Sequence, residues 1–369
     1  MQRPVFKAPG TPVEELDTPA LVVDLDRLDS NIETLHSFFR DRESTVRPHV
    51  GCHRCPAIAR RQLAVVGTAG GIAVNTVGEA ESFAHHGFND ISIASQVASP
   101  PKIARVCALA RDRTITVACD SPVVAGLLSD AAVAAGVVLR VVVDVHTRLE
   151  RGGVEPGRHA VDLALAIENA PGLRFVGLMT YEGAIFVEDA EELETESGRC
   201  IQLVLDTREA VEREGIEVEV VSVGGTYNYE IAGAMSGVTE VQAGSYALMD
   251  YRYAQYCPQF QQAARVMCTV TSHVEPGKAL TDAGEKSIGS DGGPPVVDGL
   301  PGVTGTGGSA EHGHLALEGA AQSTLSPGDK VWFIPQDLGT CFNIYDYVYA
   351  TRAGRLEAVW PIAARGLYR

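Results

Sequence analysis

The stretch RPHVGCHRCP, residues 47–56, gathers several side chains that could do chemistry. His49 and His53 could act as general bases, because an imidazole titrates near neutral pH. Cys52 and Cys55 have the Cys-x-x-Cys spacing of zinc ligands, but a second such pair is missing. Cys-Pro is also a common way to open a helix. A zinc site and a helix start therefore both stay open for these cysteines.

Two glycine-rich turns could bind an anion. They are VGGTYNY at 223–229 and QAGSYALMD at 242–250, and each follows a run of β-branched residues. Exposed backbone N–H groups and hydroxyls in such turns suit a dianionic phosphate, although each turn by itself is also typical of an ordinary chain reversal. The residues offered for such a site are Gly224, Gly225, Thr226, Gly244 and Ser245.

Two further runs end in polar side chains. VDVHTRLERGGV places Arg151 after one run, and GLMTYEG places Tyr181 and Glu182 after the next. An Arg, a Tyr and a His around a phosphate site could hold an aromatic cofactor. A buried ion pair between Arg151 and Glu182 is the structural alternative.

The elements that must position these residues alternate between strand and helix from about residue 45 to 245. Runs that are apolar on both faces, separated by helical stretches, indicate a parallel sheet covered by helices. Eight such units predict a (β/α)8 TIM barrel, in which the active site lies at the carboxyl ends of the strands. A doubly wound open sheet is the alternative. The predicted strands are 45–50, 71–77, 91–95, 114–119, 137–145, 174–181, 218–224 and 239–244.

After about residue 260 the pattern changes to short strands between turn signals, which predicts an antiparallel β domain. The stretch 284–313 is rich in glycine and proline, and we expect it to be a long loop.

Composition narrows the class of protein. The 369 residues carry a formal net charge of −17, which argues against nucleic acid or anionic membranes as partners. The N-terminus shows no apolar segment of the secretory kind, and the eight cysteines are too scattered for a disulfide framework. We therefore expect a cytoplasmic protein with reduced thiols and a small-molecule substrate.

Taken together, these motifs resemble the family of D-threonine aldolase, D-serine dehydratase and D-3-hydroxyaspartate aldolase or dehydratase. Its members are fold-type III pyridoxal 5′-phosphate enzymes with an alanine-racemase-type barrel. Counterparts occur in the same order along nearly the whole chain, among them TPALVVDLDRLDSNI, RPHVGCHRCPAIARRQL, VDVHTRLERGGV, GLMTYEG, VSVGGT and TEVQAGSYALMD.

The resemblance implies a domain division, an assembly and a cofactor site. The barrel would span 25–254, and 1–24 would join 255–369 in the β domain. A homodimer is implied, acting on an amino-acid-like substrate. The GGT and GSY turns, 224–226 and 244–246, would hold the cofactor phosphate through Gly224, Gly225, Thr226, Gly244, Ser245 and Tyr246, with Arg151 and Tyr181 near the pyridine ring.

The chain departs from the family pattern in two places. The family reads Arg-Pro-His-x-Lys-x-His, and its lysine forms the Schiff base, whereas this chain has Gly51 there. The family ends in Pro-x-His-x-Cys or Pro-x-His-x-Asp, whose side chains bind a divalent metal. The matching stretch, IPQDLGTCFN, has Asp337 and Gly339 instead. A lone carboxylate is a poor transition-metal site, so we expect no bound metal.

Three functions remain open from the sequence. The first is a lyase-type enzyme acting on a β-hydroxy or related amino acid, with pyridoxal phosphate held non-covalently and His49, His53 or Tyr181 as the base. The second is an enzyme that uses the phosphate site for another ligand and has no pyridoxal phosphate. The third is a non-catalytic binding protein.

Overall fold

The computed structural model describes residues 6–183, 186–289 and 292–369, which form two compact units. The barrel unit comprises Leu35–Gly51, Ala59–Gly244 and Leu367–Arg369. The β unit comprises Cys52–Ile58, Ser245–Gly366 and the described part of Met1–Thr34. The division expected at residues 24/25 and 254/255 stays a prediction.

The barrel unit contains a parallel sheet of eight strands, in the order β2-β9-β8-β7-β6-β5-β4-β3. Parallel bridges from Val46 to Thr68 and from His49 to Ala73 join the first strand of this order to the last. The predicted TIM barrel is thereby confirmed, and all eight expected runs contain a strand. These are β2 (Thr45–Val46), β3 (Ile72–Val74), β4 (Asp90–Gln96), β5 (Thr114–Cys119), β6 (Leu139–Asp144), β7 (Leu173–Met179), β8 (Val220–Val223) and β9 (Glu240–Val241).

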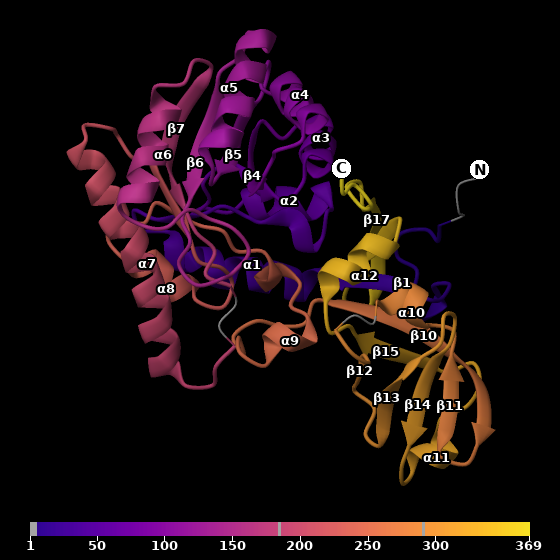
Figure 1. Ribbon diagram of the computed structural model, residues 1–369. Helices are drawn as coiled ribbons and strands as arrows, with labels where there is room; N and C mark the ends of the chain where they lie inside the picture. The colour runs from indigo at the N-terminus through magenta and orange to yellow at the C-terminus, as the bar shows by residue number, and fades with distance from the viewer. Residues whose placement is uncertain (1–5, 184–185, 290–291) are drawn as a thin grey trace. The chain divides into compact units, whose positions relative to one another are not determined.

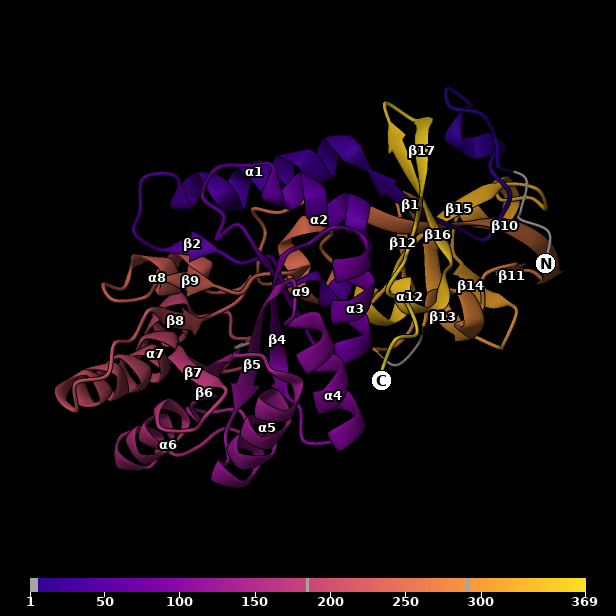
Figure 2. The same cartoon turned by 90° about the horizontal axis from the view of Figure 1, so that it is seen from above.

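Helices cover the outer face of the curved sheet, as the view in Figure 2 shows for α3 to α7. Several begin at a side chain that satisfies backbone N–H groups of the first turn. Thr76 and Glu79 form a capping box at α3, and Asp189 accepts from two N–H groups at α7. The helices are α2 (Pro56–Leu63), α3 (Val77–His85), α4 (Pro100–Leu109), α5 (Pro122–Ala135), α6 (Arg158–Glu168), α7 (Ala190–Arg213) and α8 (Tyr229–Ala234).

Burial of both faces of the sheet explains why the sequences of these strands are apolar throughout. In β5, five consecutive residues from Ile115 to Cys119 are buried, since one face meets the barrel interior and the other meets helices. Ala118, Val142, Val176 and Met179 form one buried cluster of β5, β6 and β7.

The β unit is built on a nine-stranded sheet whose main path is β13-β14-β11-β10-β1-β16-β17, with β15 joining β10 to β12 (Figure 1). The opening strand β1 pairs antiparallel with β10 and parallel with β16. The sheet is therefore mixed rather than purely antiparallel. Its strands are β1 (Ala20–Asp24), β10 (Ala264–Glu275), β11 (Lys278–Thr281), β12 (Val296–Asp298), β13 (Val303–Gly308), β14 (Gly313–Leu317), β15 (Lys330–Ile334), β16 (Tyr347–Arg352) and β17 (Arg355–Pro361).

The expectation of one long loop over 284–313 is wrong for the described part of that stretch; residues 290 and 291 lie outside it. Strand β12 pairs with β15, and β13 pairs with β14. Hydrogen-bonded pairing with neighbouring strands overrides the weak strand preference of a glycine-rich segment. The remaining helices are α1 (Leu25–Phe39), α9 (Tyr251–Ala254), α10 (Glu285–Ile288), α11 (Ala321–Thr324) and α12 (Leu338–Ile344). Among the described residues, none of the helices has both the length and the apolar character that crossing a membrane requires.

Candidate functional site

Most of the predicted site residues lie at the carboxyl ends of the barrel strands. His49 follows β2, Arg151 follows β6, Tyr181 follows β7, Gly224 follows β8 and Gly244 follows β9. This is the edge at which barrels of this type place their catalytic groups.

The ring of His49 occupies the space beside Gly51. A Cβ atom built on Gly51 would lie 2.8 Å from Cε1 of His49 and 2.9 Å from Nδ2 of Asn75. Nδ1 of His49 accepts the N–H of Gly51 at 3.3 Å, and Nε2 lies 3.2 Å from Oδ1 of Asn75. These contacts favour the neutral tautomer with its proton on Nε2. Asn75, directly after β3, is a site residue that the sequence did not single out.

Arg151, Tyr181 and Gly225 lie together. The guanidinium carbon of Arg151 is 5.4 Å from the centroid of the Tyr181 ring, within cation–π range. A Cβ atom on Gly225 would lie 3.4 Å from Cε2 of Tyr181, an ordinary contact. Gly225 thus leaves a small opening beside an aromatic ring and an exposed cation.

Close packing explains part of the glycine content of the two turns. Gly224 has a φ of +71°, and a Cβ there would lie 2.8 Å from Cβ of Ala232. A Cβ on Gly244 would lie 2.4 Å from the carbonyl oxygen of His49. The N–H of Gly225 is already used, because it donates to Oδ1 of Asn228 at 2.9 Å. Thr226 is buried. The turn therefore keeps its shape through internal hydrogen bonds.

The alternative of an Arg151–Glu182 ion pair is wrong. Arg151 is exposed, whereas Glu182 is completely buried and binds the side chain of Asn228. The guanidinium that reaches this segment is that of Arg148, which donates to the backbone oxygen of Glu182 at 3.2 Å.

Asp144, at the end of β6, is a second residue that the sequence analysis missed. Burial raises the pKa of its carboxyl to about 6, although Gln96 donates to Oδ2 at 2.7 Å and Arg151 lies near enough to oppose the shift. Asp144 can therefore exchange a proton near neutral pH. Its only sequence signal was an acidic residue closing the apolar run VVLRVVVDV.

In the β unit, the Cys52–Cys55 loop behaves as a helix start. His53 is completely buried, and its Nδ1 accepts the N–H of Cys55 at 3.0 Å. Helix α2 begins at Pro56. Burial raises the pKa of the Cys52 thiol to about 12, which opposes the thiolate that zinc needs. This geometry gives His53 a structural partner.

Ser245 and Tyr246 open a short 3₁₀ helix of the β unit, Ser245–Ala247. The Tyr246 side chain is completely buried, and its ring centroid lies 6.1 Å from that of Phe260. Packing within the β unit therefore accounts for the tyrosine.

The positions that carry metal ligands in the family motif have other partners here. Oδ1 of Asp337 accepts the N–H of Thr340 at 2.7 Å and caps α12. The carbonyl oxygen of Gly339 accepts from Nη1 of Arg54 at 2.7 Å. Lys286 is exposed and forms an ion pair with Glu311. Within the described part of the chain, no three His, Cys, Asp or Glu side chains are grouped for a metal ion.

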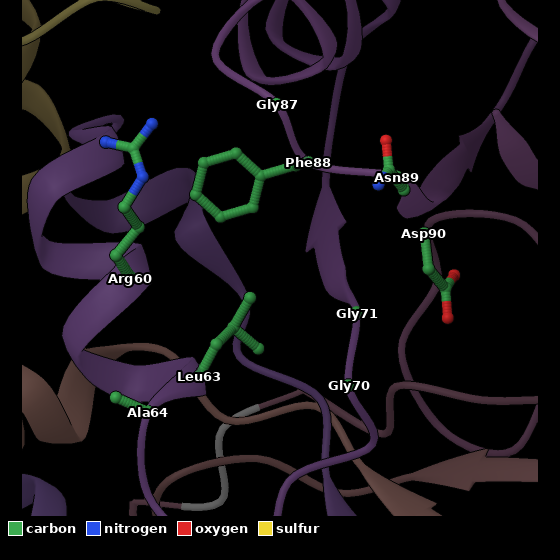
Figure 3. Close-up of a pocket in the computed structure, with 9 residues that line it drawn as sticks. All are labelled: Arg60, Leu63, Ala64, Gly70, Gly71, Gly87, Phe88, Asn89 and Asp90. Atoms are coloured by element: carbon green, nitrogen blue, oxygen red, sulfur yellow. The ribbon is translucent and has the colours of Figure 1, made fainter. Parts of the chain in front are cut away.

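A cavity of about 370 Å³ lies at the amino ends of β3 and β4, the opposite edge of the barrel sheet from the residues above. Figure 3 shows Arg60 beside the Phe88 ring at its wall, and the guanidinium carbon is 5.5 Å from the ring centroid. Asp90 at the far side pairs with Arg47 at 3.1 Å, and the same guanidinium pairs with Glu240 at 2.8 Å.

Comparison with known proteins identifies the family. Residues 23–252 match the model of the alanine racemase N-terminal domain, and residues 263–351 match a putative serine dehydratase domain. The chain is 34% identical over 366 residues to a D-threonine aldolase of an Arthrobacter species, covering 98% of this chain and 96% of that protein. The chain belongs to the D-threonine aldolase-like family of alanine-racemase-type barrels. This confirms the resemblance predicted from the motifs.

Other members of the family cover the chain as fully. A 3-hydroxy-D-aspartate aldolase of Paracoccus denitrificans (strain Pd 1222) is 31% identical, over 97% of this chain and 94% of that protein. The crystal structure of D-threonine aldolase from Filomicrobium marinum superposes with a TM-score of 0.93 at 34% identity, over 98% of this chain and 99% of that one.

Proposed function

We propose that this protein is a lyase-type enzyme that acts on a D-amino acid carrying a β-hydroxyl or related group, with pyridoxal 5′-phosphate held without a covalent bond to the chain. The family supports the reaction class, since the relatives named above are aldolases of D-threonine and 3-hydroxy-D-aspartate. The observation that carries the proposal is Gly51, which supplies no amine and whose side-chain space holds the His49 ring.

The Arg151–Tyr181–Gly225 group fits an anionic aromatic cofactor held without a covalent bond. Gly225 leaves room beside the Tyr181 ring, and Arg151 adds a positive charge there. Gly51 does not fit a cofactor bound as an imine, because glycine offers no nitrogen. When bound, pyridoxal phosphate supplies an aldehyde that condenses with the substrate amine and a ring that withdraws electrons from Cα.

His49 is our candidate for the base that the lysine provides elsewhere in the family. Its Nδ1, the unprotonated nitrogen, would receive the proton from the substrate's Cα after releasing the N–H of Gly51, while Nε2 keeps its proton toward Oδ1 of Asn75. Asn75 then acts as a positioning residue that orients the ring before substrate binds. Asp144, whose pKa is raised to about 6, is a further candidate for proton exchange at the same edge of the barrel.

The test uses the purified protein with and without added pyridoxal phosphate. We expect the absorbance of the bound aldehyde, no increase in protein mass after borohydride reduction, and turnover of D-threonine or D-3-hydroxyaspartate. His49→Gln should bind the cofactor equally well and lose turnover, and Arg111→Gln, at an exposed position after α4, is the surface control.

Two outcomes would replace the proposal with its alternatives. If the protein does not bind pyridoxal phosphate, the site serves another anionic ligand. Binding without turnover of any of these substrates indicates a non-catalytic binding protein.

A further inference from the structure

A buried carboxyl organises the turn after β8. Glu182 is completely buried, and its Oε1 accepts a hydrogen bond from Nδ2 of Asn228 at 2.5 Å. The same Nδ2 also lies 3.2 Å from Oγ of Ser197, and Oδ1 of Asn228 accepts the N–H of Gly225. One amide side chain therefore connects the Glu182 carboxyl to the backbone donor in the middle of the Gly224–Thr226 turn.

Within the described residues, the carboxyl has no counter-ion. Among the described residues, neither an arginine, a lysine nor a histidine forms an ion pair with Glu182, and Arg148 reaches only its backbone oxygen. Oε2 is buried and makes no hydrogen bond of ordinary geometry. An ionised carboxylate in such a place is strongly disfavoured. Burial accordingly raises the pKa of Glu182, while hydrogen bonding by its own backbone and by Asn228 opposes the shift.

Among the titratable groups around its carboxyl, Glu182 is the one that we expect to change its protonation state with pH. Tyr227 and Gly224 face it from the turn, Arg148 from the segment after β6, and Cys200 from α7. Burial raises the pKa of the Cys200 thiol, so this group stays protonated.

We infer that Glu182 is a positioning residue that holds the Gly224–Asn228 turn as an uncharged carboxylic acid, and that, at a pH where Glu182 has ionised in the free protein, an anion binding at this turn is accompanied by uptake of one proton onto Oε2. The inference rests on the proposed function for the place of the anion. The physical reason is linkage: a bound anion disfavours a second negative charge nearby, so the protonated form of Glu182 binds it better. The proton comes from solvent, and no bond other than O–H forms.

The test compares the wild type with Glu182→Gln, which keeps an acceptor for Asn228 but cannot ionise. The Kd of pyridoxal phosphate is measured from pH 5 to 9. Once Glu182 ionises in the free protein, we expect the wild type to lose affinity relative to the variant by about tenfold for each further pH unit. The ionisation of the ligand's own phosphate cancels in this ratio. Glu196→Gln on α7, where the carboxyl is half-exposed and pairs with Arg199, is the matched control.

Stability without ligand separates this inference from the proposed function. The wild type should lose free energy of unfolding relative to Glu182→Gln as the pH rises, because an acid whose pKa is raised on folding is disfavoured once it ionises. If neither protein binds pyridoxal phosphate but these curves diverge, the proposed function fails and the uncharged Glu182 stands. A constant ratio of Kd values, or parallel stability curves, would overturn the inference. Should Glu182→Gln not fold, calorimetry of the wild type in two buffers measures proton uptake on binding, and zero uptake at every pH refutes it.

Discussion

Replacing Gly51 by lysine is the most direct test of how the loop after β2 is built. The backbone accepts a side chain there, because Gly51 is not among the residues with positive φ. The new Cβ would meet Cε1 of His49 at 2.8 Å and Nδ2 of Asn75 at 2.9 Å. Ordinary contacts begin at 3.4 Å, so these two groups must move by 3.4 − 2.8 = 0.6 Å and 3.4 − 2.9 = 0.5 Å.

Both obstacles are ends of side chains, so the energetic cost is small. Moving them breaks the contact between His49 and Asn75, which costs about 1 kcal/mol. Replacing a glycine at a compatible position returns about 0.4–1 kcal/mol through the unfolded chain. We therefore expect Gly51→Lys to change the free energy of unfolding by less than about 1 kcal/mol, measured by denaturant titration.

The same variant should regain a covalent link to the cofactor. After incubation with pyridoxal phosphate and borohydride reduction, its mass should rise by one reduced cofactor. Gly51→Met is the control, because it occupies the same space without an amine and leaves the five native lysines unchanged. A folded Gly51→Lys that binds the cofactor but gains no mass, or equal labelling of the methionine variant, would show that residue 51 does not face the cofactor. A loss above about 3 kcal/mol would show that His49 and Asn75 cannot give way.

Two further predictions concern side chains at the ends of helices and strands. Asp337→Ala should cost about 1 kcal/mol of unfolding free energy, since it removes the side chain that caps α12 at the N–H of Thr340; an unchanged denaturation midpoint contradicts this role. Asp144→Asn should stabilise the protein at pH 7–8 and not near pH 4, because an acid whose pKa rises from 3.8 to about 6 loses stability as the pH rises through that interval. The gain is at most about 3 kcal/mol and less where solvent screens the carboxyl. Denaturation of both proteins across this pH range measures it, and a difference independent of pH is the contrary result.

The sequence by itself determined the eight barrel strands and the edge that carries the site. A strand buried on both faces must be apolar throughout, so runs such as TITVAC are visible without any knowledge of their partners. The chain order of strand and helix then places His49, Arg151, Tyr181 and Gly224 at one edge, because parallel strands share their carboxyl ends. The family motifs were equally visible, and so was the glycine at position 51.

Only the tertiary structure decided which of these residues meet. The bridges from Val46 to Thr68 and from His49 to Ala73 join the two ends of the strand order, and β12 and β13 form within a glycine-rich stretch. The bridges and the pairing of β12 with β15 depend on partners remote in sequence, whereas β13 forms a hairpin with the next strand, β14, despite its glycines. The sequence likewise offered Arg151 as a partner for Glu182, whereas the fold buries the carboxyl against Asn228 and leaves the arginine over Tyr181. Spacing along a chain limits which side chains share an edge, but packing in three dimensions selects their contacts and hence their charge.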